Sequence, residues 1–154
     1  MAAPLMTVKV GMSFRECLPA VLRDQSTDAW GGTSLMDSLL VSEVSEGRCV
    51  HALTVEASHT NMMGSLHGGC SMTLVDICST VAMMTIAAPP SVSVDLSTQF
   101  ASGASVGDVL RIVSTVDRKG RTLCFTRVQI FNDSTGGKLV AQGLHTKFLM
   151  GSSL

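Results

Sequence analysis

The chain has 154 residues, of which 45% are hydrophobic and 15% charged, and its formal net charge is −1. A chain of this length and composition is expected to form one domain around one core, and its apolar fraction excludes a disordered protein. It has more apolar surface to bury than a typical monomer, so we expect self-association. The near-neutral charge, with no long run of Lys or Arg, argues against nucleic acid as a partner.

The five cysteines are widely spaced and include no C-x-x-C pair, so neither a disulfide framework nor a zinc site is predicted. They fit a reducing compartment, and we expect a cytoplasmic location. Residues 1–12 lack the apolar core of a secretory signal, whereas Lys9 and Arg15, with no early acid, leave a mitochondrial location open. We expect no membrane span, because the apolar stretch 70–88 carries Asp76 near its centre and has no basic flanks.

The N-terminal part of the chain is predicted to contain a short helix followed by a hairpin. Ser13 as N-cap and Glu16 as its capping-box partner predict a helix over 13–25. Two β-rich runs, 34–44 and 48–57, are separated by a Ser-Glu-Gly turn and are predicted to pair.

The rest of the chain is predicted to contain one long helix and an antiparallel meander. The apolar run from Gly68 to Ala87 is too long for a strand, and a Pro-Pro pair ends the helix. Four β-rich runs separated by turns are predicted as strands: 91–100, 108–118, 121–133 and 138–149. Alternation in the first of these places Ser93 and Leu96 on opposite faces of the sheet.

These elements predict an α+β fold, because a helix that is apolar on nearly all sides must be wrapped by the sheet. We expect the wrapped domain to span residues 34–150. Residues 1–33 then form an N-terminal segment that carries the short helix.

Asp76 is the one formally charged side chain on the predicted central helix. Burying an unpartnered carboxylate costs several kcal/mol, so an isolated acid at this position is a candidate for chemistry. The alternative is a core acid whose carboxylate is satisfied by the hydroxyl groups of Thr73, Ser79 or Thr80.

A glycine pair, Gly68-Gly69, stands at the predicted start of this helix, where backbone N–H groups lack intrahelical partners and can stabilise an oxyanion. Gly68 precedes Asp76 by eight residues, which corresponds to about 12 Å of rise and roughly 80° of rotation. If both serve one reaction, they must come from two copies of the helix related by a two-fold axis. The spacing therefore predicts a site at a dimer interface.

Four segments of the sequence together resemble the hotdog-fold acyl-coenzyme A thioesterases: HTNMMGSLHGGCSMTLVDICST, SVSVDLSTQF, RKGRTLCFTRVQI and KLVAQGLHTKF. The chain looks most like the eukaryotic acyl-coenzyme A thioesterase 13 group, which is related to the bacterial PaaI thioesterases. The resemblance covers roughly residues 35–149. It implies a hotdog fold, in which a curved antiparallel sheet wraps a long central helix, and a homodimer that pairs into a homotetramer. It also implies hydrolysis of a fatty-acyl-CoA or aryl-acyl-CoA substrate to free acid and coenzyme A, with no metal and no cofactor.

The resemblance also implies a role for each residue of the motif. Asn61 and the backbone N–H of Gly68 are expected to hold and polarise the thioester carbonyl. Asp76 of the partner subunit is expected to act as a general base on water or as a nucleophile, helped by Ser93. His67 is expected to position the leaving group or to protonate it.

Further residues are predicted to contact the substrate. Gly69 and Met62 lie beside the motif, and flexible methionines of this kind suit an adaptable acyl channel. Arg118, Lys119 and Arg121 form a basic turn that fits the phosphates of coenzyme A, although such turns are more often simply solvated.

Two other functions stay open at this level. One is a hotdog dehydratase or hydratase acting on a 3-hydroxyacyl or enoyl thioester, whose motif differs from the one present. The other is a non-catalytic acyl-CoA or lipid-binding module, which has no need of a buried base. His145 and Lys147 on the last predicted strand are weak signals that a structural role explains equally well.

Overall fold

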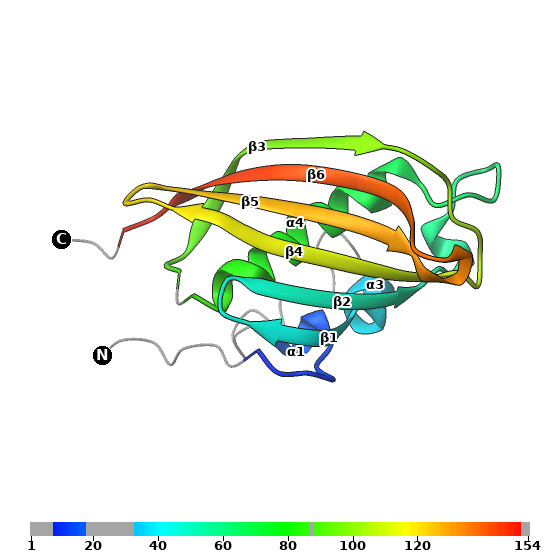
Figure 1. Ribbon diagram of the computed structural model, residues 1–154, viewed down its shortest axis with the longest axis horizontal. Coiled ribbons are helices and arrows are strands. Elements are labelled where there is room, and N and C mark those ends of the chain that lie inside the picture. Colours follow the sequence, from blue (N-terminus) through cyan, green and yellow to red (C-terminus); the bar gives the residue numbers. More distant parts are fainter. Residues whose placement is uncertain (1–7, 18–32, 87, 152–154) are drawn as a thin grey trace.

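One antiparallel sheet curves around one long helix in the computed structural model, which describes residues 8–17, 33–86 and 88–151 (Figure 1). The long helix is α4 (Gly68–Met84). The strands are β1 (Leu40–Ser45), β2 (Arg48–Thr54), β3 (Ser91–Phe100), β4 (Val109–Lys119), β5 (Leu123–Asn132) and β6 (Lys138–Leu149). The short helices are α1 (Phe14–Cys17) and α3 (Thr33–Ser38), with 3-10 turns η2 (Ala57–His59) and η3 (Asp133–Thr135).

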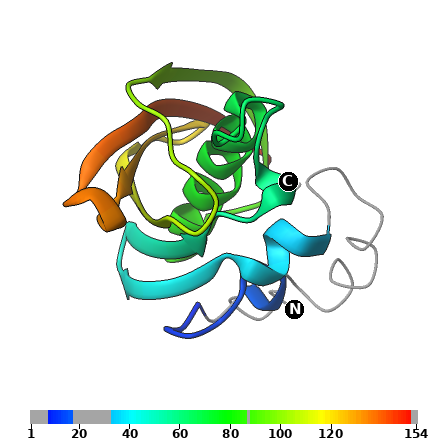
Figure 2. The ribbon, with the colours of Figure 1, turned by 90° about the vertical axis from the view of Figure 1, so that its right-hand side faces the viewer.

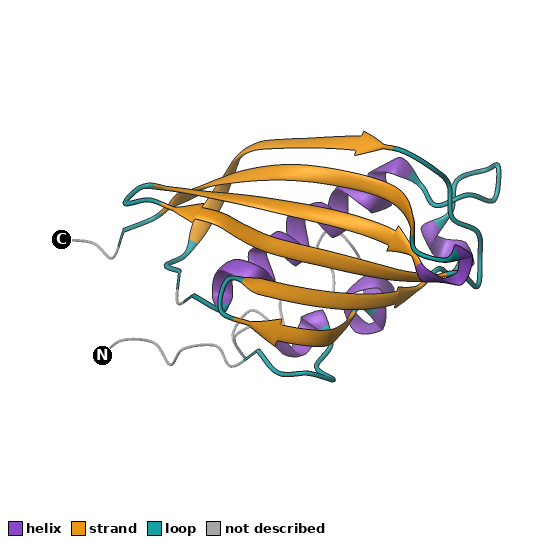
Figure 3. Ribbon diagram, in the orientation of Figure 1, coloured by secondary structure: helices purple, strands orange, loops and turns teal. Residues whose placement is uncertain are grey.

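The six strands lie in the order β1-β2-β4-β5-β6-β3, and every neighbouring pair is antiparallel. Viewed end-on, the sheet wraps around α4, which lies along its concave face (Figure 2). Strands make up most of the wrapped part, and the short helices α1 and α3 sit beside β1 (Figure 3). This is the α+β hotdog arrangement that the sequence predicted.

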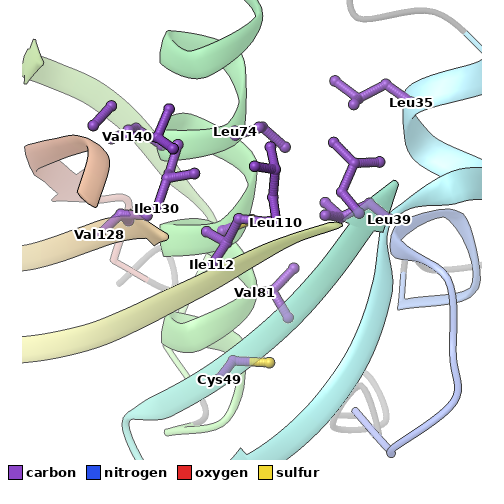
Figure 4. Close-up of a cluster of buried hydrophobic side chains, with 14 of the residues drawn as sticks. Leu35, Leu39, Cys49, Leu74, Val81, Leu110, Ile112, Val128, Ile130 and Val140 are labelled. Atoms are coloured by element: carbon purple, nitrogen blue, oxygen red, sulfur yellow. The ribbon is translucent and has the colours of Figure 1, made fainter. Parts of the chain in front are cut away.

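The core forms where α4 faces the middle of the sheet (Figure 4). Leu74, Cys78 and Val81 recur at helical spacing and are fully buried. They belong to one cluster with Ile112 of β4 and Ile130 of β5. Burying one such side chain stabilises the fold by about 1.5–3 kcal/mol, so this face fixes α4 on the sheet.

Gly143 lets α4 approach β6 closely. A Cβ atom at this position would lie 2.7 Å from Cγ1 of Val75 on the helix. The side of α4 that carries Asp76 is therefore held close to the inward-facing side chains of β6.

The side of α4 that faces away from the core cluster of Leu74, Cys78 and Val81 is not wrapped. Met72 is 42% exposed, and Thr73, Asp76 and Thr80 are half-buried along the same side. The helix is therefore less completely enclosed by its own chain than the sequence predicted.

The predicted strand 34–44 is only partly correct. Its first half forms α3, because Leu35 and Leu39 are four residues apart and both reach the core, which is helical spacing. The Leu39 N–H donates to the Leu35 carbonyl over 3.1 Å. The strand begins only at Leu40.

The two predicted helices, 13–25 and 68–87, have different bounds in the structure. The capping box of the first helix is confirmed, since the Ser13 N–H donates to Glu16 Oε2 over 2.7 Å. That helix is described only to Cys17, and the rest of its predicted span lies outside the described residues. The long helix ends at Met84 rather than Ala87, because the Thr85 hydroxyl caps it and accepts the Gly47 N–H of the β1–β2 turn at 2.8 Å.

A bulge in β3 reverses the predicted placement of Ser93. Ser93 pairs with Lys147 of β6, and Leu96 pairs with His145, so the register shifts between Ser93 and Asp95. One extra residue restarts the alternation of side chains. Ser93 and Leu96 therefore lie on the same, inward face, and not on opposite faces as predicted.

Candidate active site

Asp76 lies in the third turn of α4 and is neither isolated nor fully buried. Its side chain is 47% exposed, and its Oδ1 lies 3.4 Å from Lys147 Nζ. His145 Nδ1 lies 3.7 Å from the same oxygen. The expectation of a lone acid on an apolar helix is therefore wrong, because β6 supplies a cation and an imidazole.

The hydroxyl groups considered as alternative partners do not satisfy the carboxylate. Ser79 Oγ and Thr80 Oγ1 donate to the backbone carbonyl of Asp76 over 2.9 and 2.8 Å. Thr73 Oγ1 donates to the Gly69 carbonyl over 2.9 Å. The carboxylate oxygens of Asp76 thus stay available on the half-exposed side of the helix.

His145 links the helix to β3. Burial, and then the nearby Lys147 charge, lower its pKa to about 4, so the ring is neutral near pH 7. Its Nδ1 is 2.8 Å from Ser79 Oγ, and its Nε2 is 2.9 Å from Ser93 Oγ.

The neighbours of the ring decide which nitrogen carries the proton. Ser79 Oγ already donates to a carbonyl, so it accepts from Nδ1–H of His145. The Nε2 atom is then the acceptor, and the Ser93 hydroxyl donates to it. The lone pairs of Ser93 Oγ are then left to accept a hydrogen bond.

The helix start presents backbone N–H groups that have no partner among the described residues. His67 is the N-cap of α4, and its Nδ1 accepts the Gly69 N–H at 2.9 Å. Gly69 is therefore not available as an oxyanion donor. The Gly68 N–H has no acceptor among the described residues, as expected at the first position of a helix. Because Nδ1 of His67 accepts this hydrogen bond, Nδ1 carries no proton and the ring N–H is on Nε2.

Asn61 stands in the loop that leads into this helix. Its Oδ1 accepts the N–H groups of Met63 at 2.9 Å and Ser65 at 3.3 Å. This turn fixes the amide and leaves its Nδ2 without an acceptor in the described part of the chain. Asn61 Nδ2 and the Gly68 N–H are thus two unused donors on the same loop and helix start.

The donors and the Asp76 group are separated within one chain. Gly68 and Asp76 stand eight residues apart on a straight helix, about 12 Å along its axis. The edge strand β3, which carries Ser93, leaves Val92 49% and Val94 60% exposed. An edge strand with exposed apolar side chains is a surface on which a second copy can pair.

The predicted substrate contacts lie in two different places. The basic turn between β4 and β5 is exposed and lies at the same end of the sheet as Ser93. The strand pairing shows this: Lys119 of β4 pairs with Cys124 of β5, which pairs with Lys147 of β6, which pairs with Ser93 of β3. Three strand spacings separate Lys119 from Ser93, roughly 14 Å. Met62 is fully exposed at the tip of the Asn61 loop.

His145 and Lys147, noted from the sequence only as weak signals, lie beside Asp76 and join the site. Both lie on β6 at alternate positions with Gly143 and Leu149, and all four are buried. The signal that could have identified them is this alternation, because it places two polar side chains on a face that should be apolar.

The cysteines of the helix are not nucleophile candidates. Burial raises the pKa of Cys70 to about 11 and that of Cys78 well above its usual value. In the described residues, no helix is long and apolar enough to cross a membrane.

Comparison with known proteins extends the likeness over most of the chain. The family model described as the thioesterase superfamily matches residues 63–138. Acyl-coenzyme A thioesterase 13 from Homo sapiens is 37% identical over 138 residues, which are 89% of this chain and 94% of that protein.

Two solved structures share the fold. Zebra fish thioesterase superfamily member 2 has a TM-score of 0.74 and 38% sequence identity, covering 82% of this chain and 91% of that one. A hypothetical thioesterase from Streptococcus pneumoniae, crystallised with coenzyme A, has a TM-score of 0.73 and 26% identity, covering 84% and 97%. With the curved sheet around α4 and the motif from Asn61 to Asp76, this identity over nearly the whole chain shows that it belongs to the hotdog-fold acyl-coenzyme A thioesterases.

Proposed function

We propose that the protein hydrolyses fatty-acyl-CoA or aryl-acyl-CoA to the free acid and coenzyme A, at a site shared by two copies of the chain. The single observation that carries this proposal is the pair of unused donors, Asn61 Nδ2 and the Gly68 N–H, set apart from the Asp76–Ser93 group. Two copies that pair antiparallel through β3 bring the donors of one copy towards the carboxylate of the other. The coenzyme A found with the Streptococcus pneumoniae relative supports the choice of thioester.

The geometry supports attack by water. A water oxygen bonds to the carbonyl carbon while the Asp76 carboxylate takes one proton from it, and Ser93 Oγ accepts a hydrogen bond from the other. The carbonyl electron pair moves onto oxygen, and this oxyanion accepts hydrogen bonds from Asn61 and Gly68. When the carbonyl re-forms and the C–S bond breaks, the bond's electron pair leaves on the sulfur of coenzyme A, which takes the proton from Asp76. The Nε2–H of His67 can donate a hydrogen bond that positions this leaving group.

Attack by the Asp76 carboxylate itself is the second route, through an acyl anhydride. Single turnover in water enriched in oxygen-18 tests this route, because label found in Asp76 would show that water opens an anhydride at that residue. We expect the label in the product acid alone, since Ser93 is placed to orient a water.

Other properties of the molecule belong to the same proposal. The reaction needs no metal and no cofactor besides the coenzyme A of the substrate. We place the basic turn at Arg118, Lys119 and Arg121 near the phosphates of coenzyme A, and Met62 near the acyl group.

The dimers are expected to pair into a homotetramer. The free thiols of Cys49, Cys70, Cys78 and Cys124 support a reducing compartment, the cytoplasm or the mitochondrial matrix, and a role in lipid metabolism follows from the substrate class.

The test is thiol release from a panel of short, medium, long and aryl acyl-CoAs. We expect turnover of at least one class by the native protein, and a fall in kcat of roughly 10²–10⁴-fold in Asp76→Asn, because the general base is lost. Glu46→Gln, which neutralises an exposed carboxylate in the β1–β2 turn, is the matched control and should keep native activity. Turnover retained by Asp76→Asn would contradict the role of this carboxylate. Binding of acyl-CoA with no thiol release by the native protein would favour a lipid-binding module.

A further inference from the structure

Lys147 occupies a position where a cation is costly. It lies on the inward face of β6, between the buried His145 and Leu149, and is only 6% exposed. Lysine is almost never this buried unless it is paired, because its charge loses the solvation of water. The Asp76 carboxylate, 3.4 Å from its Nζ, is its ion-pair partner among the described residues.

Lys147, and not His145, is the counter-ion of Asp76. Burial and the neighbouring lysine lower the pKa of His145 to about 4, so the imidazole carries no charge near pH 7. The other charged group near this cluster is Asp95 of β3, which acts on His145. The helix α4 contributes no charge besides Asp76.

The position of Lys147 also fixes the direction of the carboxylate. Lys147 pairs with Ser93 across neighbouring strands, so the two side chains lie side by side on the inward face. An ammonium at this place attracts the half-exposed carboxylate towards Ser93 and away from open solvent. Ser93 Oγ is in turn held by His145 Nε2 at 2.9 Å.

We infer that Lys147 is a positioning residue for hydrolysis, which holds the Asp76 carboxylate turned towards the water that we place at Ser93. This role rests on the proposed function and assigns to β6 a part of the machinery that the helix motif alone does not contain. The ion pair orients the carboxylate, and the partial exposure of Asp76 weakens the attraction. Loss of the ammonium should therefore lower kcat more than it changes KM.

The test compares Lys147→Met, which keeps the length and loses the charge, with Lys147→Arg, which keeps the charge. We expect Lys147→Met to lower kcat roughly 10-fold to 100-fold with KM nearly unchanged. Lys147→Arg should recover most of the lost kcat, because it restores a cation beside Asp76. Lys138→Met, at the exposed start of the same strand, is the matched control and should behave as native.

A purely structural lysine would give a different pattern, a lower melting temperature with native kcat. Removing one partner of an ion pair leaves the other charge unpaired, so we expect Lys147→Met to melt below the native protein in either case. If Lys147→Met fails to fold, the same measurements are made with Lys147→Gln. A kcat that stays native in the neutral variant would overturn the inference, and so would a raised KM with unchanged kcat.

The inference and the proposed function can fail separately. Crystal structures of the variants without substrate show directly where the Asp76 carboxylate points. It should turn away from Ser93 in Lys147→Met and keep its native direction in Lys138→Met. A native protein that hydrolyses no acyl-CoA would refute the proposed function, whereas an unchanged carboxylate in Lys147→Met would refute the role of Lys147.

Discussion

At the scale of single residues, the site depends on how a few polar groups are partnered. Asp76 is held by Lys147, and His145 is held neutral between two serines. The hydroxyl donors on α4 are used by backbone carbonyls. Each polar side chain near the carboxylate therefore has defined hydrogen-bond or ion-pair partners, and a single substitution should have a specific effect on activity.

His51 is a buried polar residue outside this site, and it should make stability depend on pH. The residue is fully buried on β2, its Nδ1 has no hydrogen-bond partner, and burial lowers its pKa to about 4 from the usual 6.5. The unfolded chain therefore takes up a proton below pH 6.5, whereas the folded protein does so only near pH 4. The stability contributed by the neutral ring is complete above pH 6.5 and is lost as the pH falls, by up to about 1.4 kcal/mol per unit.

Urea denaturation of the native protein and His51→Leu between about pH 7 and about pH 4.5 measures this effect. We expect the free energy of unfolding to fall less steeply with acidification in His51→Leu. At pH 7 we expect His51→Leu to be at least as stable as the native protein, because the substitution removes a buried nitrogen that has no hydrogen-bond partner. Equal slopes for the two proteins would contradict the assignment.

At the scale of elements, the site depends on how closely α4 approaches β6 and on the bulge in β3. Gly143 permits the close approach, and the bulge turns Ser93 inward next to Lys147. Neither feature forms part of the helix motif, yet both decide which groups meet Asp76.

Gly143→Ala should separate these two elements. Its methyl group would lie 2.7 Å from Val75 Cγ1 and 2.9 Å from the Ser97 carbonyl oxygen, so the helix or the strand must shift. We expect a loss of about 1–3 kcal/mol of stability by urea denaturation, together with a lower kcat, because Asp76 moves relative to His145. Gly151→Ala, where nothing lies within 4 Å, is the control and should change stability by less than about 0.5 kcal/mol. Native stability of Gly143→Ala would show that the contact is not tight.

At the scale of the whole molecule, one chain carries two half-sites. The donors lie at the start of α4 and in the loop before it, whereas Asp76 and Ser93 lie two turns along α4 and on the edge strand. The exposed apolar side chains of that edge give a second copy a surface to pair with. We therefore expect neither half-site to act within an isolated chain.

Mixing two inactive variants tests this arrangement. In a mixture of Asp76→Asn and Asn61→Ala, half of the exchanged dimers are mixed, and each mixed dimer contains one intact site. Activity should therefore recover to about a quarter of the native value. Asp76→Asn mixed with Ser93→Ala is the control, because both changes fall in the same half-site and no intact site can form. Lack of recovery in the first mixture, despite demonstrated subunit exchange, would argue against a shared site.

The sequence by itself determined the family, the central helix, the succession of strands along the chain and the motif from Asn61 to Asp76. The meander that it predicted holds for β4, β5 and β6, whereas β3 lies beside β6 and not beside β4. The features that it determined depend on local patterns: apolar periodicity, turn residues, and a helix start with two glycines. The alternation of a strand is equally local, but one extra residue at a bulge reverses it, which is why the face of Ser93 was predicted wrongly. The same limit applies to α3, whose leucines fit a helix as well as a strand.

Only the tertiary structure decided which groups meet the carboxylate. Lys147 and His145 are about 70 residues from Asp76 in the chain. Their contact with Asp76 depends on the register of β6 against β3 and on the glycine of β6 that lets α4 approach closely. Contacts of this kind depend on packing between distant segments, and no window of sequence contains them. The sequence therefore identified the acid, and the fold supplied the cation that accompanies it.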